Sequence, residues 1–529
     1  MKKLMFSILP ALLLALVSCM NTSQESEGGS VRVVLPSSSR ALYSSGHDDV
    51  DSFTVRLLLD EKIINEKSIT KETADTGGAI VFDELEPATY TVEAEGWMSS
   101  RDALLYFGTE EAKVTAGQDA DCQVKLKKDC QIYNISANAR ELKTACEADG
   151  NIYIFMDKDS SVSTNQATPE NQLANITSGT KIIRGNGGKL VQSTDDNKTL
   201  TTEGDQIKLF NVTGSSTILE INNLTFTASS IVGTTSTLDG ALICVDDGAT
   251  VILKQCYING MSMSNQGISL IYVKSGGTLL LENCTFYNNT STNKGNVSFS
   301  ECIRIENGAQ VEVVSCNFDS NGHENIISNS AAIENSGSCR ITNTTFKGNK
   351  ANRGSAIMNN DTGSLEIEDS TFDSNMCTSN SGYYARRGGA IFIQGGTVKI
   401  KDSAFTSNKA GGNNPGNEGE ENNLQMVGGG AISIKMGSLT LQNTRFDSNS
   451  VTSIPTNSTN TKYGYGGAVL IEQSDASLLL KDASGAAMDI ASYINNYMSG
   501  NTVGKGKKGA NIYCNGGTIN GTVYTEAWE

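Results

Sequence analysis

The chain has 529 residues, 38% of them hydrophobic and 19% charged, which is long enough for two or three domains with cores of their own. A formal net charge of −17 argues against nucleic acid or an anionic lipid surface as the main partner. With 53 glycines and only 6 prolines, the composition suits a turn-rich repeat rather than a disordered tail.

Residues 1–18 have the features of a bacterial export signal. Lys2 and Lys3 precede an apolar run that is too short to span a membrane and that ends in Leu-Val-Ser-Cys at Cys19. This ending resembles the lipobox of bacterial lipoproteins. The resemblance implies that Cys19 becomes an acylated N-terminus, whose several acyl chains, palmitate among them, hold the protein on a membrane. The alternative is ordinary secretory cleavage near Ser18 that leaves Cys19 unmodified.

The residues after Cys19 bear on where the protein is sorted. Met20 rather than Asp follows the cysteine, which by resemblance to enteric sorting disfavours the inner membrane. We therefore expect a lipid anchor in the cell envelope, at the outer membrane, and leave open whether the protein faces the cell surface or the periplasm. Residues 19–30 are polar and rich in Gly and Ser, as in a flexible tether.

Residues 31–129 contain short runs of strand type separated by turn residues, which predicts a small antiparallel sandwich of prealbumin or immunoglobulin type. Residues 76–96 resemble the B-type modules of collagen adhesins, in which a Pro-x-x-Tyr hairpin, here Pro87 and Tyr90, follows an apolar strand. The resemblance implies a stalk or spacer. Carbohydrate binding is the alternative role for this domain.

Residues 130–529 form the second predicted domain. Residues 138–149 have apolar side chains at helical spacing and are followed by a strand at 151–156, which resembles the helix that covers the first coil of pectate-lyase-type β-helices. Degenerate early coils are expected at 180–188 and 216–226. Residues 484–529 lose the repeat and are expected to form the second cap.

Between residues 239 and 512 the motif GGA[ILV] alternates with Phe-x-x-Asn, and the apolar residues within each unit alternate. Period two predicts short strands with one buried face. Stacked units of this kind predict an all-β fold, a right-handed parallel β-helix of about eleven coils. The alternation skips at turn-forming residues, which places a bend at Asn283, Asn343, Asp369, Asp402 and Asn443.

Stacking predicts columns of like residues. We expect Ile367, Ile400 and Leu441 to lie one above another, and the asparagines of the Phe-x-x-Asn motifs to form a ladder of side-chain hydrogen bonds. A tight inner wall is expected from a column of small residues. That column is Ala241, Ser269, Cys302, Ala332, Ala356, Ala390, Ala431 and Ala468.

The 12 cysteines are expected to serve mainly as buried thiols. Cys256, Cys284 and Cys316 fall in one column, which Thr344, Ser370, Ser403 and Thr444 continue. Cys244, Cys302 and Cys339 are also expected to point inward. A column gives a line of ligands rather than a tetrahedron, and parallel Cβ vectors suit a disulfide poorly, so we expect neither a metal site nor pairing within it.

Polysaccharide enzymes share this fold, so we searched for their residues. The only histidines are His47 and His323, and the paired-Asp and Gly-His-Gly motifs of polygalacturonases are missing. Arg386 and Arg387 lie beside no cluster of Asp that could hold calcium, as pectate-lyase sites require. The remaining candidates each have a structural explanation, as turn residues, bend residues or solvated insertions. They are Asp246 with Asp247, Asp369 with Asp402, and Glu418, Glu420 and Glu421. We expect no catalytic, cofactor-binding or metal-binding residues.

The alternation of GGA[ILV] with Phe-x-x-Asn resembles the repeats of the chlamydial polymorphic membrane proteins, which are surface adhesins with a β-helical passenger. This chain departs from them by having no C-terminal membrane barrel. The resemblance implies adhesion to, or display of, a host or matrix protein or glycan through corner loops at 290–299, 376–387, 409–428 and 450–465. A carbohydrate-active enzyme or glycan-binding protein on the same fold is the alternative.

Overall fold

The structure is a computed structural model. It describes residues 28–35, 50–60, 62–99, 103–128, 130–136, 138–163, 173–192, 209–228, 242–263, 269–291, 301–322, 331–377, 387–411, 427–452, 464–503 and 508–529. Its contacts divide the chain into two compact units, residues 1–131 and 132–529.

The first unit contains two small sheets. The larger has the order β3 (Lys62–Thr70), β2 (Ser52–Leu59), β5 (Thr89–Met98), β6 (Ala103–Lys113) and β8 (Lys127–Lys128), and the smaller the order β4 (Ala79–Leu85), β1 (Gly29–Val34) and β7 (Asp119–Gln123). The pairings between the described strands of this unit are antiparallel, as predicted, except for β1 with β7, which run parallel. Val31, Phe82, Val55 and Val92 are fully buried in this unit.

Two details of this unit differ from the sequence expectation. Strand β3, with the helix α2 (Lys71–Asp75) after it, was not predicted, because β3 buries no residue and therefore carries no alternation. The predicted Pro-x-x-Tyr hairpin is also absent, since β4 pairs with β1 and β5 with β2 and β6. The Tyr90 hydroxyl instead donates to the Glu86 carbonyl at 3.0 Å and fixes the crossover between the sheets.

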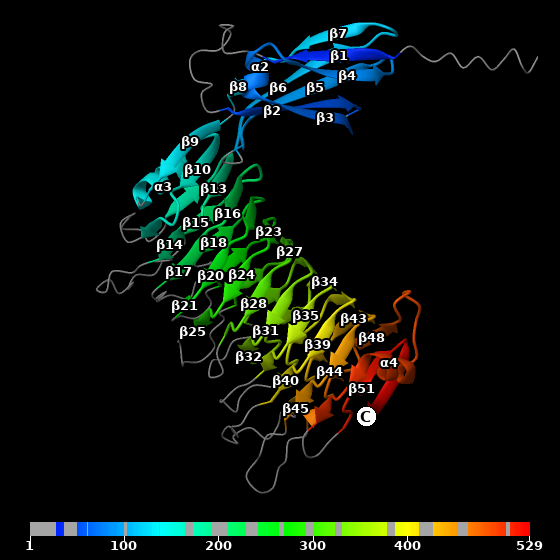
Figure 1. The fold of residues 1–529 in the computed structure, drawn as a ribbon. Coiled ribbons are helices and arrows are strands. Elements are labelled where there is room, and N and C mark those ends of the chain that lie inside the picture. Colours follow the sequence, from blue (N-terminus) through cyan, green and yellow to red (C-terminus); the bar gives the residue numbers. More distant parts are fainter. Residues whose placement is uncertain are drawn as a thin grey trace, which may run out of the picture. The chain divides into compact units, whose positions relative to one another are not determined.

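The second unit begins with β9 (Cys130–Ile135) and the predicted capping helix, α3 (Ala139–Glu147). Asn138 is the N-cap, because its Oδ1 accepts from the backbone N–H groups of Arg140 at 3.0 Å and Glu141 at 3.4 Å. The apolar face of α3 is buried against β10 (Asn151–Met156) and β12 (Ala174–Ile176), at the first coil (Figure 1). The helix thereby covers the end of the core that no earlier coil could cover.

Each complete coil contributes one strand to each of three parallel sheets, here called the first, second and third sheets in coil order. The first sheet holds β12, β15 (Phe210–Val212), β18 (Ile243–Val245), β22 (Ile271–Val273), β26 (Ile303–Ile305), β29 (Ile333–Asn335), β33 (Ile357–Asn359), β37 (Ile391–Ile393), β42 (Ile432–Ile434), β47 (Val469–Ile471) and β51 (Ile512–Ile519). The second holds β10, β13 (Thr180–Arg184), β16 (Ile218–Asn222), β19 (Thr250–Lys254), β23 (Thr278–Glu282), β27 (Gln310–Val314), β30 (Ser338–Thr342), β34 (Ser364–Glu368), β38 (Thr397–Lys401), β43 (Gly437–Gln442) and β48 (Ala476–Lys481).

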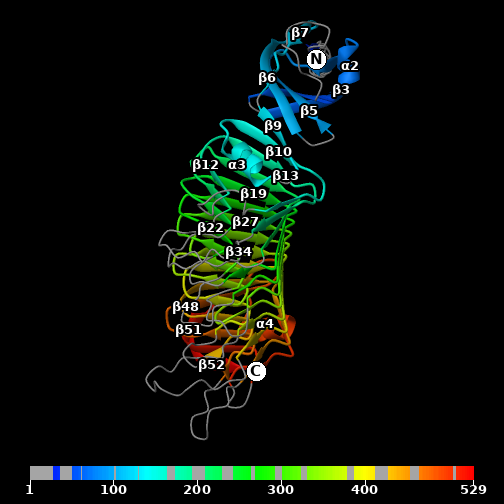
Figure 2. The same cartoon turned by 90° about the vertical axis from the view of Figure 1, so that its left-hand side faces the viewer.

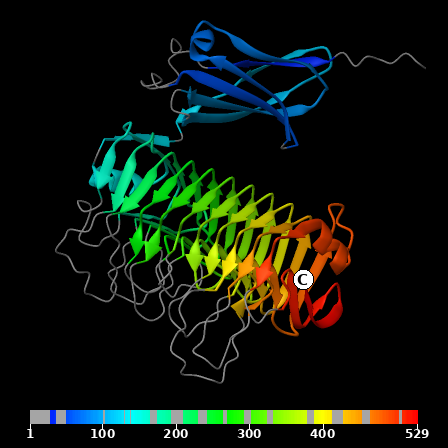
Figure 3. The ribbon, with the colours of Figure 1, turned by 60° about the horizontal axis from the view of Figure 1, so that its bottom comes forward.

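The third sheet has 11 strands, which agrees with the predicted number of coils. They are β11 (Ser161–Ser163), β14 (Lys189–Gln192), β17 (Thr225–Ala228), β20 (Tyr257–Asn259), β24 (Thr285–Tyr287), β28 (Asn317–Asp319), β31 (Thr345–Lys347), β35 (Thr371–Asp373), β39 (Ala404–Thr406), β44 (Arg445–Asp447) and β49 (Met498–Ser499). Figures 2 and 3 show the coils stacked along the second unit.

Short strands follow the third sheet where the chain turns toward the next coil. They are β21 (Ser262–Met263), β25 (Thr290–Ser291), β32 (Lys350–Ala351), β36 (Met376–Cys377), β40 (Lys409–Ala410), β41 (Val427–Gly428), β45 (Ser450–Val451), β46 (Gly464–Tyr465) and β50 (Thr502–Val503). They also pair in parallel with their counterparts in neighbouring coils.

Like residues stack in register, as predicted. Ile367 pairs with Ile400, and Ile400 with Leu441. A run of six buried phenylalanines stacks with ring centroids 4.5 to 5.0 Å apart, namely Phe286, Phe318, Phe346, Phe372, Phe405 and Phe446. Such offset contacts stabilise each coil on its neighbours beyond simple burial.

The asparagine ladder is confirmed. In each rung the side-chain Nδ2 donates to Oδ1 of the asparagine in the next coil at 2.9 to 3.0 Å, through Asn289, Asn321, Asn349, Asn375, Asn408, Asn449 and Asn501. The second amide hydrogen donates to the carbonyl of a phenylalanine or isoleucine in the previous coil. These side chains are buried, so their polar groups need the partners that stacking supplies.

The small-residue column is out of register at Ser269. Ile271 pairs with Ile303, so Leu270 stacks on Cys302 and Ser269 stands one place earlier. The predicted member Ala241 lies outside the described residues. The expectation aligned small residues, whereas the buried isoleucines set the register.

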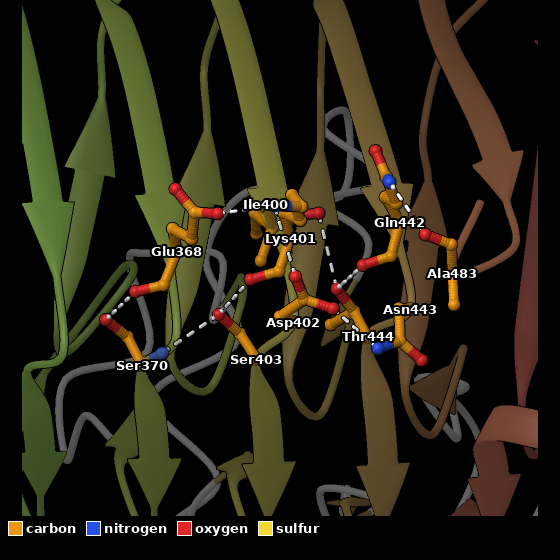
Figure 4. Close-up of polar contacts among 10 residues, drawn as sticks. All are labelled: Glu368, Ser370, Ile400, Lys401, Asp402, Ser403, Gln442, Asn443, Thr444 and Ala483. Atoms are coloured by element: carbon orange, nitrogen blue, oxygen red, sulfur yellow. Dashed lines mark hydrogen bonds and ion pairs between the residues drawn. The ribbon is translucent and has the colours of Figure 1, made fainter. Parts of the chain in front are cut away.

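The predicted bends have left-handed backbone conformations. Asp369 and Asp402 have φ of +50° and +48°, and Asn283, Asn343 and Asn443 have φ between +45° and +53°. Asp and Asn tolerate this region better than other non-glycine residues. Beside the bend, hydroxyls link successive coils: the Ser370 backbone N–H donates to Ser403 Oγ at 3.1 Å (Figure 4).

The C-terminal cap keeps more of the repeat than predicted. Helix α4 (Ile490–Tyr497) replaces the bend of its coil and buries Tyr493, whose hydroxyl donates to the Thr444 carbonyl at 2.9 Å. After it, Met498 pairs with Phe446, and Asn501 adds a rung to the asparagine ladder. The hairpin of β51 with β52 (Thr522–Trp528) then covers the last coil.

Candidate functional site

Several predicted residues lie outside the described residues. They are Cys19, His47, His323, Arg386, Glu418, Glu420 and Glu421. The expected corner loops at 290–299, 376–387, 409–428 and 450–465 fall largely outside as well, with only their ends described. The lipid attachment at Cys19 and the role of these loops therefore stay predictions.

The aspartates weighed as a catalytic pair have structural roles. Asp402 Oδ1 accepts from Asn443 Nδ2 across the bend, and Asp402 Oδ2 lies 3.3 Å from Lys401 Nζ (Figure 4). Asp246 Oδ1 accepts from the backbone N–H of Asp247 at 2.8 Å, and its Oδ2 lies 3.1 Å from Lys274 Nζ. These contacts give Asp402 a structural role in a bend and Asp246 one in a turn.

The outer side of the first sheet is the most unusual surface of the second unit. In the first two strands of this sheet, β12 and β15, the residues that point away from the core are the exposed Asn175 and the half-buried Asn211. From β18 onward the residues at this place also point away from the core, yet nearly all of them are buried. They are Cys244, Tyr272, Arg304, Glu334, Met358, Phe392, Ser433, Leu470 and Tyr513, and among these nine only Arg304 is half-buried. Cys244 belongs to this row, so the expectation that it points into the core was wrong, whereas Cys302 and Cys339 do.

Glu301 precedes β26 and is fully buried. Its Oε1 accepts from Ser269 Oγ at 2.8 Å and lies 3.9 Å from Arg304 Nη1, while its Oε2 has no hydrogen-bond partner among the described residues. Burial, reinforced by the nearby Glu334 carboxylate, raises the pKa of Glu301 to about 8 against the opposing effect of Arg304. At neutral pH this carboxyl therefore holds a proton.

Glu334 is the next acidic group of this cluster, at the middle of β29 and in register with Arg304. Its side chain is 6% exposed, Oε1 accepts from Asn360 Nδ2 at 3.0 Å, and Oε2 has no hydrogen-bond partner in the described part of the chain. We refer to Glu301, Arg304 and Glu334 as the acid cluster. A buried carboxyl beside a second carboxyl and an arginine is an arrangement that can support acid–base chemistry.

A second buried charge pair lies on the same side of the first sheet. Arg387 Nη2 is 3.0 Å from Glu472 Oε2, and Ser433 Oγ donates to Glu472 Oε1. Burial raises the pKa of Glu472, which Arg387 and Ser433 partly offset. The guanidinium of Arg387 also lies 5.6 Å from the centroid of the Phe392 ring.

Neither charge cluster was found in the sequence. Glu301 occupies a place that other coils fill with small residues, here Ser269, Ala331, Ser355, Gly389, Gly430 and Gly467. A glutamate in a column of Ala, Ser and Gly is a signal in the sequence, because a buried carboxyl needs partners that a small residue does not. Glu472 is far from Arg387 in the sequence, and nothing local marked them as partners.

The cysteine column is confirmed, and hydrogen bonds link its members from one coil to the next. The backbone N–H of Cys284 donates to Cys316 Sγ at 3.4 Å, and that of Cys316 to Thr344 Oγ1 at 3.2 Å. The thiols thus act as the hydroxyls do in later coils. Burial raises the pKa of Cys339 to about 12, which keeps this thiol protonated. No group of three or more metal-ligating side chains occurs within the described ranges.

Comparison with known proteins supports the fold. A family model described as a right handed beta helix region matches residues 208–386, and no curated protein matches the chain. None of the helices in the described part is both long and apolar enough to cross a bilayer. Over residues 208–386 the chain is similar to right-handed β-helix proteins, and the in-register strands continue this right-handed parallel β-helix from β10 to β51.

Proposed function

We propose that the protein is a cell-envelope lipoprotein that displays ligand-binding corner segments on a stiff β-helix and acts as an adhesin. The observation that carries the proposal is the contrast between fixed and variable parts of a coil. From the first sheet to the asparagine ladder, the described coils keep the same strands and register. From each ladder asparagine to the next first-sheet strand, the chain varies in length, from a short step after Asn349 to a long one after Asn408.

The rigidity of the scaffold supports this role. Each coil is tied to its neighbours by backbone ladders, stacked phenylalanines and side-chain amide bonds, so little conformational freedom remains at the bases of the corner segments. A rigid base lowers the entropic cost that binding segments must overcome on association. Interaction with a host or matrix protein or a glycan is the function that such a scaffold suits best.

Envelope attachment is tested separately from binding. Metabolic labelling with a palmitate analogue should mark the chain and should fail for Cys19→Ala. Protease treatment of intact cells should cleave within 412–426 or 453–463 if these segments face outward. Protection in intact cells, followed by cleavage after the outer membrane is opened, would place the protein on the periplasmic side and contradict surface adhesion.

Adhesion is tested on cells that display the chain. Replacing residues 412–426 by a Gly/Ser linker of equal length should reduce attachment to immobilised matrix proteins or host cells. Replacing exposed residues of the second sheet, such as Lys399 and Glu366, provides a matched control on the same scaffold. Unchanged attachment with both kinds of variant would contradict the adhesin proposal.

A further inference from the structure

A pair of tyrosines lies on the outer side of the third sheet. Among the described residues only four large hydrophobic side chains are exposed, and Tyr287 at 42% is one of them. Tyr287 ends β24 and points away from the core, since its neighbour Phe286 joins the buried phenylalanine stack. Tyr257 begins β20 in the previous coil and is half-buried. The adjacent strands β20 and β24 are seen in Figure 1.

The two rings are held parallel by the sheet itself. Tyr257 pairs with Thr285, and Tyr287 pairs with Asn259, so the tyrosines are diagonal neighbours in adjacent coils. Their ring centroids are 6.5 Å apart and their planes differ by 15°. Because parallel strands on both sides fix the backbone, the ring pair is oriented before any ligand arrives.

Polar side chains border the rings on the same face. Asn259 lies beside Tyr287 and Thr285 beside Tyr257 in the adjacent strands. In the next coil Asn317 pairs with Thr285, and Asp319 pairs with Tyr287. No hydrogen-bond partner is found for the side-chain amides of Asn259 and Asn317 among the residues that the structure describes. Amides and a carboxylate beside aromatic rings offer the donors and acceptors that sugar hydroxyls require.

A purely structural role explains part of this arrangement. Cross-strand aromatic pairs add modestly to the stability of a sheet. Other coils have no such pair: the places of Tyr257 and Tyr287 are taken by Thr345 and Lys347 in one coil, and by Thr371 and Asp373 in another. Sheet stability therefore does not require tyrosines here, and it does not require an exposed Tyr287 with polar side chains beside it.

We propose that Tyr257 and Tyr287 form a stacking platform for a neutral oligosaccharide. The C–H faces of pyranose rings are weakly positive and suit the negative faces of the tyrosines, while Asn259, Asn317 and Asp319 bind the hydroxyls. The net charge of −17 and the carboxylate of Asp319 disfavour an anionic glycan. This inference names a ligand class for the display role proposed above and rests on it, but it places the contact on a strand face rather than on a corner segment.

The test uses the detergent-solubilised full chain on immobilised tetrasaccharides of β-linked glucose, galactose and N-acetylglucosamine. The double variant Tyr257→Ala/Tyr287→Ala should lose at least tenfold in affinity for the sugar that binds, whereas Tyr257→Phe/Tyr287→Phe should retain stacking and lose less than threefold. Thr371→Ala, on the same sheet but away from the rings, should bind as the parent does. Asn259→Ala should weaken binding without affecting the melting temperature.

Two outcomes overturn the inference. One is the absence of binding to all three sugars by the folded parent chain, and the other is unchanged binding by the folded double Ala variant. If the double variant does not fold, the Asn259→Ala and Phe variants decide. Attachment of cells to a glycan-free protein surface tests the adhesin proposal separately. If the folded parent chain attaches there but binds none of the three sugars, the glycan platform is overturned and the adhesin proposal stands.

Discussion

Asn375 donates both its backbone N–H and its side-chain Nδ2 to one atom, Oδ1 of Asn408, at 3.0 Å in each case. Its own Oδ1 accepts the same two bonds from Asn349, at 3.1 and 2.9 Å. Through its backbone N–H and its side chain, an interior rung of the ladder therefore takes part in five hydrogen bonds, counting the one to the Phe346 carbonyl at 2.9 Å. These side chains are buried, so if a rung is removed, water does not replace the hydrogen-bond partners that its neighbours lose.

We expect Asn375→Leu to lower the free energy of unfolding by about 3 kcal/mol or more, because several buried donors and acceptors lose partners at about 1–3 kcal/mol each. Urea unfolding followed by circular dichroism measures the change. Thr406→Ala, on the outer side of the neighbouring strand β39, is the control and should cost less than about 0.5 kcal/mol. Equal effects of the two substitutions would mean that the ladder contributes no net stability.

The cysteine column makes a different prediction. Cys316 Sγ donates to the Val314 carbonyl at 3.3 Å, as Ser370 and Ser403 donate to carbonyls in the same place of later coils. Cys316→Ser should therefore change stability by less than about 1 kcal/mol, whereas Cys316→Leu should cost about 1–3 kcal/mol by overpacking. Thermal unfolding compares them. A larger loss for serine than for leucine would show that the thiol acts as an apolar group and not as a rung.

The bend at Asp402 can be tested through its backbone. With φ at +48°, Asp402→Gly should be close to neutral, while Asp402→Val should cost about 2 kcal/mol because a β-branched side chain is strained there. Both variants lose the contact with Asn443, so the difference between them isolates the conformational effect. Similar melting temperatures for the two variants would contradict the proposed strain.

Glu301 predicts how stability depends on pH. Its folded pKa of about 8 lies above the ordinary value of 4.5, so the folded state binds the extra proton between these values. This contribution is fully present below about pH 4.5 and is lost as pH rises through 8, at up to about 1.4 kcal/mol per pH unit. Glu301→Gln should remove this slope and be the more stable form above pH 8.

The measurement for Glu301 is denaturant unfolding of the parent and of Glu301→Gln at intervals from pH 5 to 9. Glu366→Gln is the exposed control, since the pKa of Glu366 is lowered by its hydrogen bond from Lys399 and it titrates below this range. Parallel stability profiles for the parent and Glu301→Gln would show that Glu301 is ionised throughout.

The coils were predictable from sequence because the same physical demand recurs in each of them. A buried Phe, a buried Asn and a bend residue with positive φ each restrict the choice of amino acid. Because these restrictions recur in every coil, the pattern can be recognised in the sequence. Strand β3 was not predicted, because it is exposed along its length and needs no alternation of apolar and polar residues. The parallel pairing of β1 with β7 was not predicted either, because it depends on how segments distant in the sequence pack together.

The acid cluster was not predicted from the sequence for a related reason. Burial on the outer side of the first sheet is not a property of the strand pattern, which only says that Arg304 and Glu334 point away from the core. Their partners come from other coils, and Ser269, which donates to Glu301, was aligned one place away from it. The alignment of successive coils in the first sheet was the missing information. The positions of the buried isoleucines predict this alignment better than the positions of small side chains do.

The asparagine ladder makes the coils interchangeable. Deleting residues 350–375 would join Asn349 to Met376, which already follows an equivalent asparagine, so Asn349 would meet Asn408 as Asn375 does now. Whole coils can thus be lost or duplicated without disturbing the contacts of those that remain. The reach of the scaffold can change in units of one coil, by recombination within the gene, while the two caps stay the same.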